Sequence, residues 1–347
     1  MNSKKTIPKK LPNEPVKSLQ YDLFTAFLAN DESSVSNAIE LWDSIPKYFL
    51  TAKQQEKLRT SDGLAKSYNW EYSYQGKDCK IRIQPALIVQ DDGSDKAFFP
   101  SVTEEVVEEA LKKILTDQQY GVHNPQKSES WVKFSLSMLY KELKEKGKAR
   151  SRAEIKHAIT VLSRCIITLY REGKEVYSGP ILSDLVTVDR DKYLSDTDSY
   201  HAARLPAFIS HGINQLQYRQ FNYARLMECS EQLTRWLYKR LVHRYRHASL
   251  LETYHFLFSD VKQASGLLQQ GTDRRNRKKL LSALDELQGK EMLLKYETKE
   301  VKEGRKIIDV KYTVTAAPNF IKEQKAANKR HNQNLDKAQS QGVLTKS

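Results

Sequence analysis

The chain has 347 residues, 39% of them hydrophobic, which is enough for two or three folded domains. No stretch approaches the roughly 18 consecutive apolar residues of a membrane span, and the basic start carries no apolar run typical of a secretion signal. We therefore expect a cytoplasmic protein without a membrane partner. Cys79, Cys165 and Cys229 are scattered, so the sequence predicts neither a disulfide framework nor a metal site.

The net charge of +14 is concentrated in the C-terminal part of the chain. Residues 1–200 contain 30 basic and 29 acidic residues, a net +1, whereas residues 201–347 contain 27 and 14, a net +13. Because each Lys or Arg set against a phosphate releases condensed counterions, this asymmetry favours a polyanionic partner. The alternative is a solubilising surface with a basic tail.

Residues 1–33 are interpreted as a flexible arm, Lys- and Pro-rich at its start, with helical periodicity at about 18–29. A second helix is expected at about 34–44. The alternating segment 68–75, a Gly-Lys-Asp turn and the segment 80–89 then predict a β-hairpin. These elements form an N-terminal α+β segment.

A first winged helix is predicted downstream, so that residues 34–195 form one domain with the α+β segment. A helix at 101–118 and another at 151–164 each begin with a capping box, a Ser followed three residues later by Glu. A strand at 131–134 and a helix at 136–146 lie between them, and a hairpin follows. The order helix, strand, helix, helix, hairpin is that of a winged helix, whose third helix enters the major groove.

The same order returns in residues 200–318, which we interpret as a second, basic winged helix. A long helix at 226–245 precedes a strand at 254–258, a short helix, a third helix at 273–288 and a hairpin. The short strands begin near 131 and 253 and the third helices near 151 and 272, offsets of 122 and 121 residues. Residues 319–347 are expected to be a disordered basic tail. The fold class is α+β, with tandem winged-helix domains, an N-terminal α+β extension and disordered basic termini.

The third helix of the second unit carries the strongest DNA-binding pattern. A stripe of Leu280, Leu281, Leu284 and Leu287 faces the core, which turns basic residues outward. The predicted DNA-binding residues of this unit, on the helix and on the wing turn, are Arg274, Arg275, Lys278, Lys279, Ser282, Lys302, Arg305 and Lys306. The alternative is a solvated basic helix face.

The corresponding helix of the first unit is only weakly basic. Ile155, Ile159 and Leu162 point inward, so the outward residues are Ala153, His157, Thr160, Val161 and Arg164. His157, Thr160 and Arg164 are candidates for groove contact, with a protein interface as the alternative. The long helix 226–246 also carries outward cations, which we expect to stay solvated or to approach the DNA backbone from the side: Arg235, Lys239, Arg240, Arg244 and Arg246.

Four blocks together resemble plasmid replication initiators of the tandem winged-helix RepA type: FPSVTEEVVEEALKKI at 99–114, FSLSMLYKEL at 134–143, YRQFNYARLMECSEQLTRWLYKRL at 218–241 and SGLLQQGTDRRNRKKLLSALDEL at 265–287. The resemblance covers about residues 40–316 and rests on the order of the blocks. It implies binding to repeated origin DNA, cooperation with a host replicative helicase and initiator, and often repression of the protein's own promoter. In related initiators the first domain commonly serves homodimerisation and the second supplies much of the DNA affinity.

A short peptide near the start resembles the motif by which bacterial proteins bind the replicative sliding clamp. It consists of Gln20, Tyr21, Asp22, Leu23 and Phe24, in which Leu and Phe fill an apolar pocket and Gln supplies directional hydrogen bonds. The alternative is the first turn of an amphipathic helix whose Leu23, Phe24 and Phe27 belong to the core.

No pattern predicts an enzyme or a cofactor. A phosphate-binding Gly-rich loop and a His-apolar-His metal triplet are both missing from the sequence. His243 and His247 are spaced as in zinc proteases, but Arg244 stands where the catalytic Glu is needed. The leading hypothesis is a sequence-specific origin-binding initiator, and the alternative is a tandem winged-helix transcriptional regulator without a role in replication.

Overall fold

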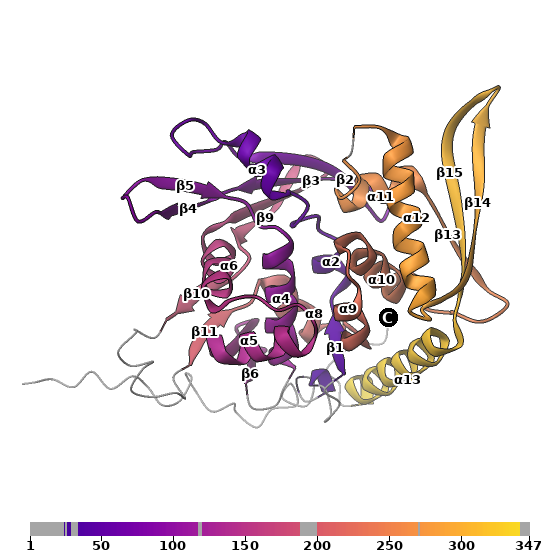
Figure 1. Ribbon diagram of the computed structural model, residues 1–347. Coiled ribbons are helices and arrows are strands. Elements are labelled where there is room, and N and C mark those ends of the chain that lie inside the picture. Colours follow the sequence, from indigo (N-terminus) through magenta and orange to yellow (C-terminus); the bar gives the residue numbers. More distant parts are fainter. Residues whose placement is uncertain are drawn as a thin grey trace, which may run out of the picture.

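The computed structural model describes residues 24, 26–28, 34–116, 120–187, 200–269 and 271–340, and Figure 1 shows them. The first elements are β1 (Val35–Ala38), α2 (Glu40–Asp43) and α3 (Ala52–Leu58). The helix expected at 34–44 is therefore wrong in its first half. Residues 35–38 form a strand because they pair antiparallel with β12 (Arg219–Asn222), a partner nearly 200 residues away that local periodicity cannot reveal.

The predicted N-terminal hairpin is confirmed as β2 (Tyr68–Tyr74) and β3 (Lys77–Gln84). Three inward side chains of β3, Cys79, Ile81 and Ile83, alternate with exposed ones, as expected for a strand with one buried face. A second hairpin follows, formed by β4 (Ala86–Val89) and β5 (Asp95–Phe98).

The first winged-helix order is confirmed. Its elements are α4 (Val102–Leu115), β6 (Gly121–Asn124), β7 (Glu129–Phe134), α5 (Leu136–Glu145), α6 (Arg152–Arg164), β8 (Ile166–Arg171), β9 (Lys174–Pro180), β10 (Ser183–Val186), β11 (His201–Arg204) and α8 (Ala207–Asn214). Both predicted capping boxes form: Ser101 N donates to Glu104 Oε2 at 2.8 Å, and Ser151 N donates to Glu154 Oε2 at 2.8 Å.

The hairpin of the first unit does not close onto β7. It extends the N-terminal hairpin in a sheet of order β2-β3-β8-β9, whereas β7 pairs with β6 and β11 in a separate sheet. Register pairs such as Ile81 with Leu169 tie the two hairpins together. The N-terminal α+β segment is therefore part of the first winged helix and not an independent domain.

The second unit closes as a winged helix with a three-stranded sheet of order β13-β15-β14. Its elements are α9 (Tyr223–Glu228), α10 (Gln232–Arg244), β13 (Thr253–Leu257), α11 (Phe258–Ser265), α12 (Asp273–Gly289), β14 (Leu293–Glu303) and β15 (Lys306–Ala316). The single long helix expected at 226–245 is wrong, because an extended residue, Cys229, separates α9 from α10. The carbonyl groups of Cys229 and Ser230 at this break each accept a hydrogen bond from Arg235 Nη1 at 3.1 Å.

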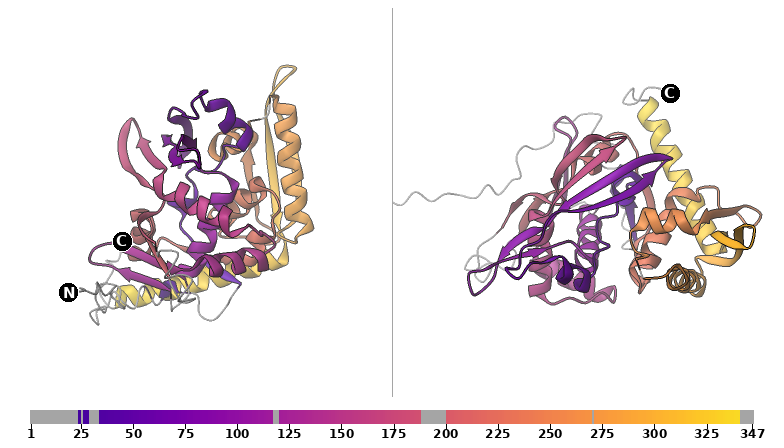
Figure 2. Two further views of the ribbon diagram at one scale, coloured as in Figure 1. Left: turned by 60° about the vertical axis from the view of Figure 1, so that its left-hand side comes forward. Right: turned by 90° about the horizontal axis from the view of Figure 1, so that it is seen from above.

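The C-terminal segment corrects another expectation. Residues 318–340 form a helix, α13 (Pro318–Ser340), where a disordered tail is expected from the polar composition. Phe320, Ile321 and Ala327 give this helix a narrow buried face, which packs on β12. Figure 2 shows the helix in yellow, continuing from the end of the second unit. Pro318 begins the helix at a position where its missing N–H costs nothing. Among the helices of the described residues, none is long and apolar enough to cross a membrane.

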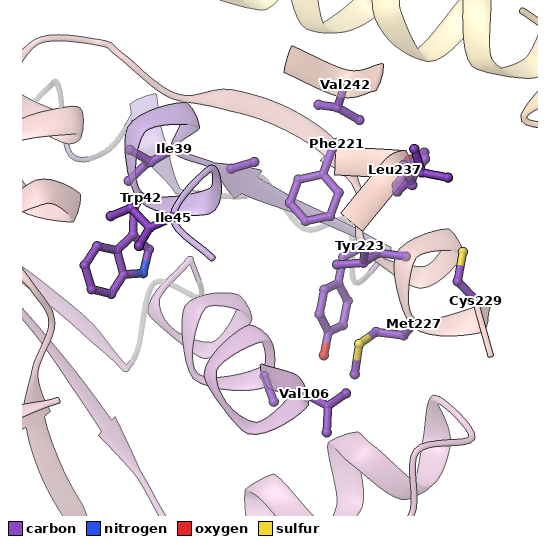
Figure 3. Packing of buried hydrophobic residues seen from close by; sticks show 14 of the residues in the cluster. Ile39, Trp42, Ile45, Val106, Phe221, Tyr223, Met227, Cys229, Leu237 and Val242 are labelled. Carbon is purple, nitrogen blue, oxygen red and sulfur yellow. The ribbon is translucent and has the colours of Figure 1, made fainter. Parts of the chain in front are cut away.

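The two units share one hydrophobic core. Figure 3 shows Ile39 and Trp42 of the N-terminal segment in the same cluster as Val106 of α4 and Phe221 and Leu237 of the second unit. Because β1 also pairs with β12, the N-terminal segment is hydrogen-bonded to the second unit. Because β11 pairs with β7 and α8 packs on β7, residues 201–214 lie with the first unit, and the two units are packed together and not two free domains.

Candidate nucleic-acid interface

Helix α12 is fixed by its cap and by its leucines. Thr272 is the N-cap, and its Oγ1 accepts a hydrogen bond from the backbone N of Arg275 at 3.4 Å. Leu280, Leu284 and Leu287 are buried, where α12 packs on α10 and β14. Burial of this stripe at helical spacing determines which side chains face the solvent.

The outer face of α12 presents most of the predicted DNA-binding residues. Arg274, Arg275, Lys278 and Ser282 are exposed. Arg275, Lys278 and Ser282 also line one open groove of about 370 Å³ together with Lys279, so the structure brings these four predicted side chains together. Guanidinium, ammonium and hydroxyl groups in this arrangement can donate hydrogen bonds to phosphates and base edges.

Lys279 is less accessible to a DNA ligand than the neighbouring cations of α12. Its side chain is partly covered, and its Nζ donates to the carbonyl of Leu267 at 3.1 Å. Burial lowers the pKa of this ammonium group. Lys279 therefore lies at the inner edge of the groove, tied to the loop that precedes α12.

The one acidic residue in the first turn of α12 is neutralised by a cation that the sequence analysis missed. Lys262 Nζ of α11 lies 2.6 Å from Asp273 Oδ1, and this hydrogen bond lowers the pKa of the Asp273 carboxyl group. Lys262 precedes Asp273 by 11 residues, a spacing with no periodic signal. The start of α12 therefore presents no uncompensated negative charge from Asp273 to a polyanion.

The wing is the hairpin β14–β15, which extends beyond the body of the molecule beside α12 (Figure 1). Gly304 makes the tight turn at its tip, with a φ of +59° that favours glycine. Arg305 and Lys306 are exposed next to this turn, and within the described residues neither has a carboxylate partner. Lys302 is also exposed but lies 2.9 Å from Glu300, so part of its charge is offset.

The candidate residues of the first unit are engaged by their own chain. The ring of His157 packs edge-on against Phe98 of β5, with 4.5 Å between centroids, and Arg164 Nη1 lies 3.4 Å from the carbonyl of Leu87 in β4. Thr160 Oγ1 donates to the carbonyl of Lys156 at 2.9 Å. The β4–β5 hairpin thus covers part of α6, and α6 lies well apart from α12 (Figure 1). Val161, expected to point outward, is buried.

The cations of α10 correct the expectation that this helix face is solvated. Arg235, 2% exposed, pairs with Glu105 of α4 at 2.8 Å. Lys239 contacts Asp43 of α2 at 2.8 Å and also Glu109 of α4. Helical spacing turns these side chains away from their own unit, but the sequence does not show that the acidic face of α4 packs against them.

The remaining cations of α10 and its C-terminal end are more accessible. Arg240 Nε donates to the Tyr254 hydroxyl group at 3.2 Å. Arg244 and Arg246 each lie 3.0 Å from Glu40, and their side chains remain 39% and 51% exposed.

The charged groups where α2, α4 and α10 meet shift one another's pKa values. Burial alone would raise the pKa of Asp43, but the charges of Lys112 and Lys239 and the ring of His243, whose Nε2 lies 3.5 Å away, outweigh it and hold this pKa well below its usual value. Burial would also lower the pKa of Lys112, but Asp43 and Glu109 raise it well above its usual value. The two units are therefore joined by ion pairs as well as by apolar packing.

Only Phe24 of the clamp-like peptide falls in the described part of the chain. It is 6% exposed and stacks against Phe27 and His123, with ring centroids 6.1 and 5.5 Å apart. Gln20, Asp22 and Leu23 lie outside the described residues. In this structure Phe24 occupies the core position that the helical alternative predicts.

No protein-family model matches the chain, and no curated protein matches it either. Among solved structures, the fold is similar to domains 2 and 3 of RctB, with 14% sequence identity over 79% of this chain and 97% of that chain and a TM-score of 0.48. It is also similar to the Pi initiator protein, crystallised in complex with iteron DNA, with 13% identity over 83% of this chain and 100% of that chain and a TM-score of 0.37. These values are too low to transfer a function, so we base the proposed function on this chain's own residues.

Proposed function

We propose that this chain binds double-stranded DNA through its second winged helix, with α12 in the major groove and the β14–β15 wing on the neighbouring backbone. The observation that carries the proposal is the exposed face of α12, where Arg274, Arg275 and Lys278 are unaccompanied by a free carboxylate in the first turns. Arg275 can reach the acceptors of a guanine in a bidentate fashion, and Lys278 can neutralise a phosphate.

The distribution of buried cations sharpens this proposal. Residues 201–347 carry a net +13, but Arg235 and Lys239 are used inside the molecule against α4 and α2. The exposed cations of α12 and the wing tip remain available to a polyanion. A solubilising surface alone does not require Asp273 to be neutralised at the start of the helix.

We further propose that the DNA is a replication origin with repeated sites, and that the protein acts as a plasmid-type initiator without catalysing a reaction itself. The support is the resemblance of its ordered sequence blocks to such initiators. Recruitment of a host helicase, initiator or sliding clamp, homodimerisation and repression of its own promoter belong to this proposal. A tandem winged-helix transcriptional regulator is the competing function, because it shares every DNA-binding feature.

The dominant DNA-binding unit is tested by comparing two double variants. Arg275→Ala with Lys278→Ala should weaken binding to the specific site about tenfold or more, because each lost contact to phosphate or base costs of the order of 1 kcal/mol or more. His157→Ala with Arg164→Ala, matched in number of substitutions on α6, should change affinity less. Equal losses in quantitative binding titrations would show that the first unit contributes as much as the second.

The replication role is tested separately. The gene and its flanking DNA, placed on a circle that cannot otherwise replicate, should maintain that circle in a host cell. The flanks should contain repeats about two helical turns apart beside an A·T-rich stretch. Failure to replicate, with normal binding to those repeats, would favour the transcriptional regulator.

A further inference from the structure

A cleft lies where the two winged-helix units and α13 meet. It has a volume of about 490 Å³, and its walls come from α2, α8, the β2–β3 turn and the ends of β8 and α10, as well as from β12 and α13. None of its lining residues belongs to α12 or to the wing. The cleft is large enough for a small-molecule ligand and is distinct from the proposed DNA-binding face.

The lining of the cleft contains a buried guanidinium group that has no carboxylate partner among the described residues. Arg219 is 7% exposed, and its Nη2 donates to Gln324 Oε1 at 2.5 Å and to Asn328 Oδ1 at 2.7 Å. Both acceptors are neutral amides. Burial, together with the charge of Arg246, lowers the pKa of Arg219 to about 10. A buried cation with only neutral partners is costly, and an anion placed beside it would relieve that cost.

A second guanidinium group in the lining of the cleft has unused hydrogen-bonding capacity. The Nε atom of Arg171, at the end of β8, is buried and has no hydrogen-bond partner among the described residues. Arg171 and Arg246 both lie close enough to Tyr74 for their charges to act on its hydroxyl group. An unsatisfied buried donor of this kind calls for an acceptor that the described part of the protein does not provide.

Positive charge exceeds negative charge in the cleft. Glu40 is the one carboxylate among the lining residues, and Arg244 and Arg246 already bridge it at 3.0 Å each. Three histidines, His211, His243 and His331, also line the cleft. Burial and the charges of Arg219 and Arg246 lower the pKa of His331, so a bound anion would favour its protonated form.

We propose that this cleft binds a phosphate-bearing small molecule, held by Arg171, Arg219 and Arg246. The planar guanidinium group donates paired hydrogen bonds that match the oxygens of a phosphate, which an ammonium group cannot do. Arg171 belongs to the first unit, whereas Arg219 and Arg246 belong to the second. A bound phosphate would therefore bridge the two units and stabilise their observed arrangement.

The experiment is a calorimetric titration of the full chain with pyrophosphate and, in parallel, with ATP, at matched ionic strength. We expect one saturable site for pyrophosphate, weakened about tenfold or more by Arg171→Gln because one charge-assisted hydrogen-bonding group is lost. Lys80→Gln, which removes an exposed charge on β3 outside the cleft, should leave the affinity unchanged. Tighter binding of ATP than of pyrophosphate would identify a nucleotide as the ligand class, and equal binding would identify the phosphate groups alone.

A second variant distinguishes a loss of ligand binding from a folding defect caused by Arg171→Gln. Arg246→Gln alters a side chain that is 51% exposed and should weaken pyrophosphate binding in the same way, with thermal unfolding confirming that both variants are folded. Absence of saturable binding, or unchanged binding by both variants, would overturn the proposal. The proposal would also be overturned if pyrophosphate did not bind and both variants weakened DNA binding. The cleft would then be part of the DNA-binding surface.

Discussion

Arginine and lysine side chains serve two different purposes in this molecule. On α12, Arg275 and Lys278 point into solvent, whereas on α10, Arg235 and Lys239 are enclosed by carboxylates of another unit. Taking such charges out of water costs several kcal/mol per ion, which the pairing only approximately offsets. The main effect of the buried pairs is therefore to determine which face of α4 packs against α10, and their net contribution to stability is small.

Removal of one partner from this contact should be costly. Arg235→Met would leave Glu105 without its ion pair and the carbonyls of Cys229 and Ser230 without their donors. We expect a loss of about 3–5 kcal/mol in the free energy of unfolding, measured by urea denaturation. Arg246→Met, which breaks a half-exposed pair with Glu40, should cost under about 1 kcal/mol. Similar losses for the two variants would contradict the buried role of Arg235.

The same contact should make stability depend on pH. The pKa of Asp43 is held below its ordinary value of 3.8, so the unfolded chain binds a proton there at a higher pH than the folded chain does. Its stabilising contribution is complete above the unfolded pKa and is lost as the pH falls through the folded pKa. In urea denaturation between pH 6 and pH 3, Asp43→Asn should lose stability less steeply than the wild type, and parallel slopes would argue against the shift.

At the scale of elements, α13 shows how a polar segment can still be structural. Its buried residues are few, and they include Gln324, whose side chain accepts a hydrogen bond from Arg219. The helix packs on β12, which in turn pairs with β1. Helix α13 therefore supports the strand pair that joins the N-terminal segment to the second unit. Composition alone predicts disorder here because the apolar contribution is concentrated near its first turn.

A single substitution distinguishes a packed helix from a disordered tail. Phe320 is fully buried against Tyr238 and Tyr245, with ring centroids 6.2 and 6.3 Å apart, so Phe320→Ala should cost about 3–5 kcal/mol of stability. Lys322→Ala, at an exposed position of the same helix, should be nearly neutral. Equal stability of the two variants in thermal unfolding would mean that the segment does not pack.

At the scale of the whole molecule, the two winged-helix units are unequal. The second presents its third helix and wing to solvent, whereas α6 of the first is partly covered by the β4–β5 hairpin, through Phe98 and Leu87. The β8–β9 hairpin of the first unit also forms one sheet with the N-terminal strands β2 and β3. The first unit thus supports the second through a shared core and a charged contact.

Sequence patterns predict this molecule well where the signal is local. Capping boxes place the starts of α4 and α6, and the leucine stripe identifies the exposed face of α12. They fail where contacts with a distant segment determine the structure. Residues 35–38 form the strand β1 because they pair with β12. Lys279 and Arg235 point away from the leucine core as expected, but Lys279 donates to the carbonyl of Leu267 and Arg235 pairs with Glu105. The sequence therefore predicts which helix face is exposed. It does not predict which side chains on that face are free to contact DNA.

The salt dependence of DNA binding tests the central claim most directly. The slope of log K against log salt concentration counts the phosphate charges neutralised, at about 0.9 per contact. Arg275→Ala with Lys278→Ala should lower the magnitude of this slope by up to about two, whereas Lys53→Ala with Lys57→Ala, two exposed cations on α3, should leave it unchanged. An unchanged slope for the α12 variant, or an equal decrease for both variants, would contradict DNA binding through α12.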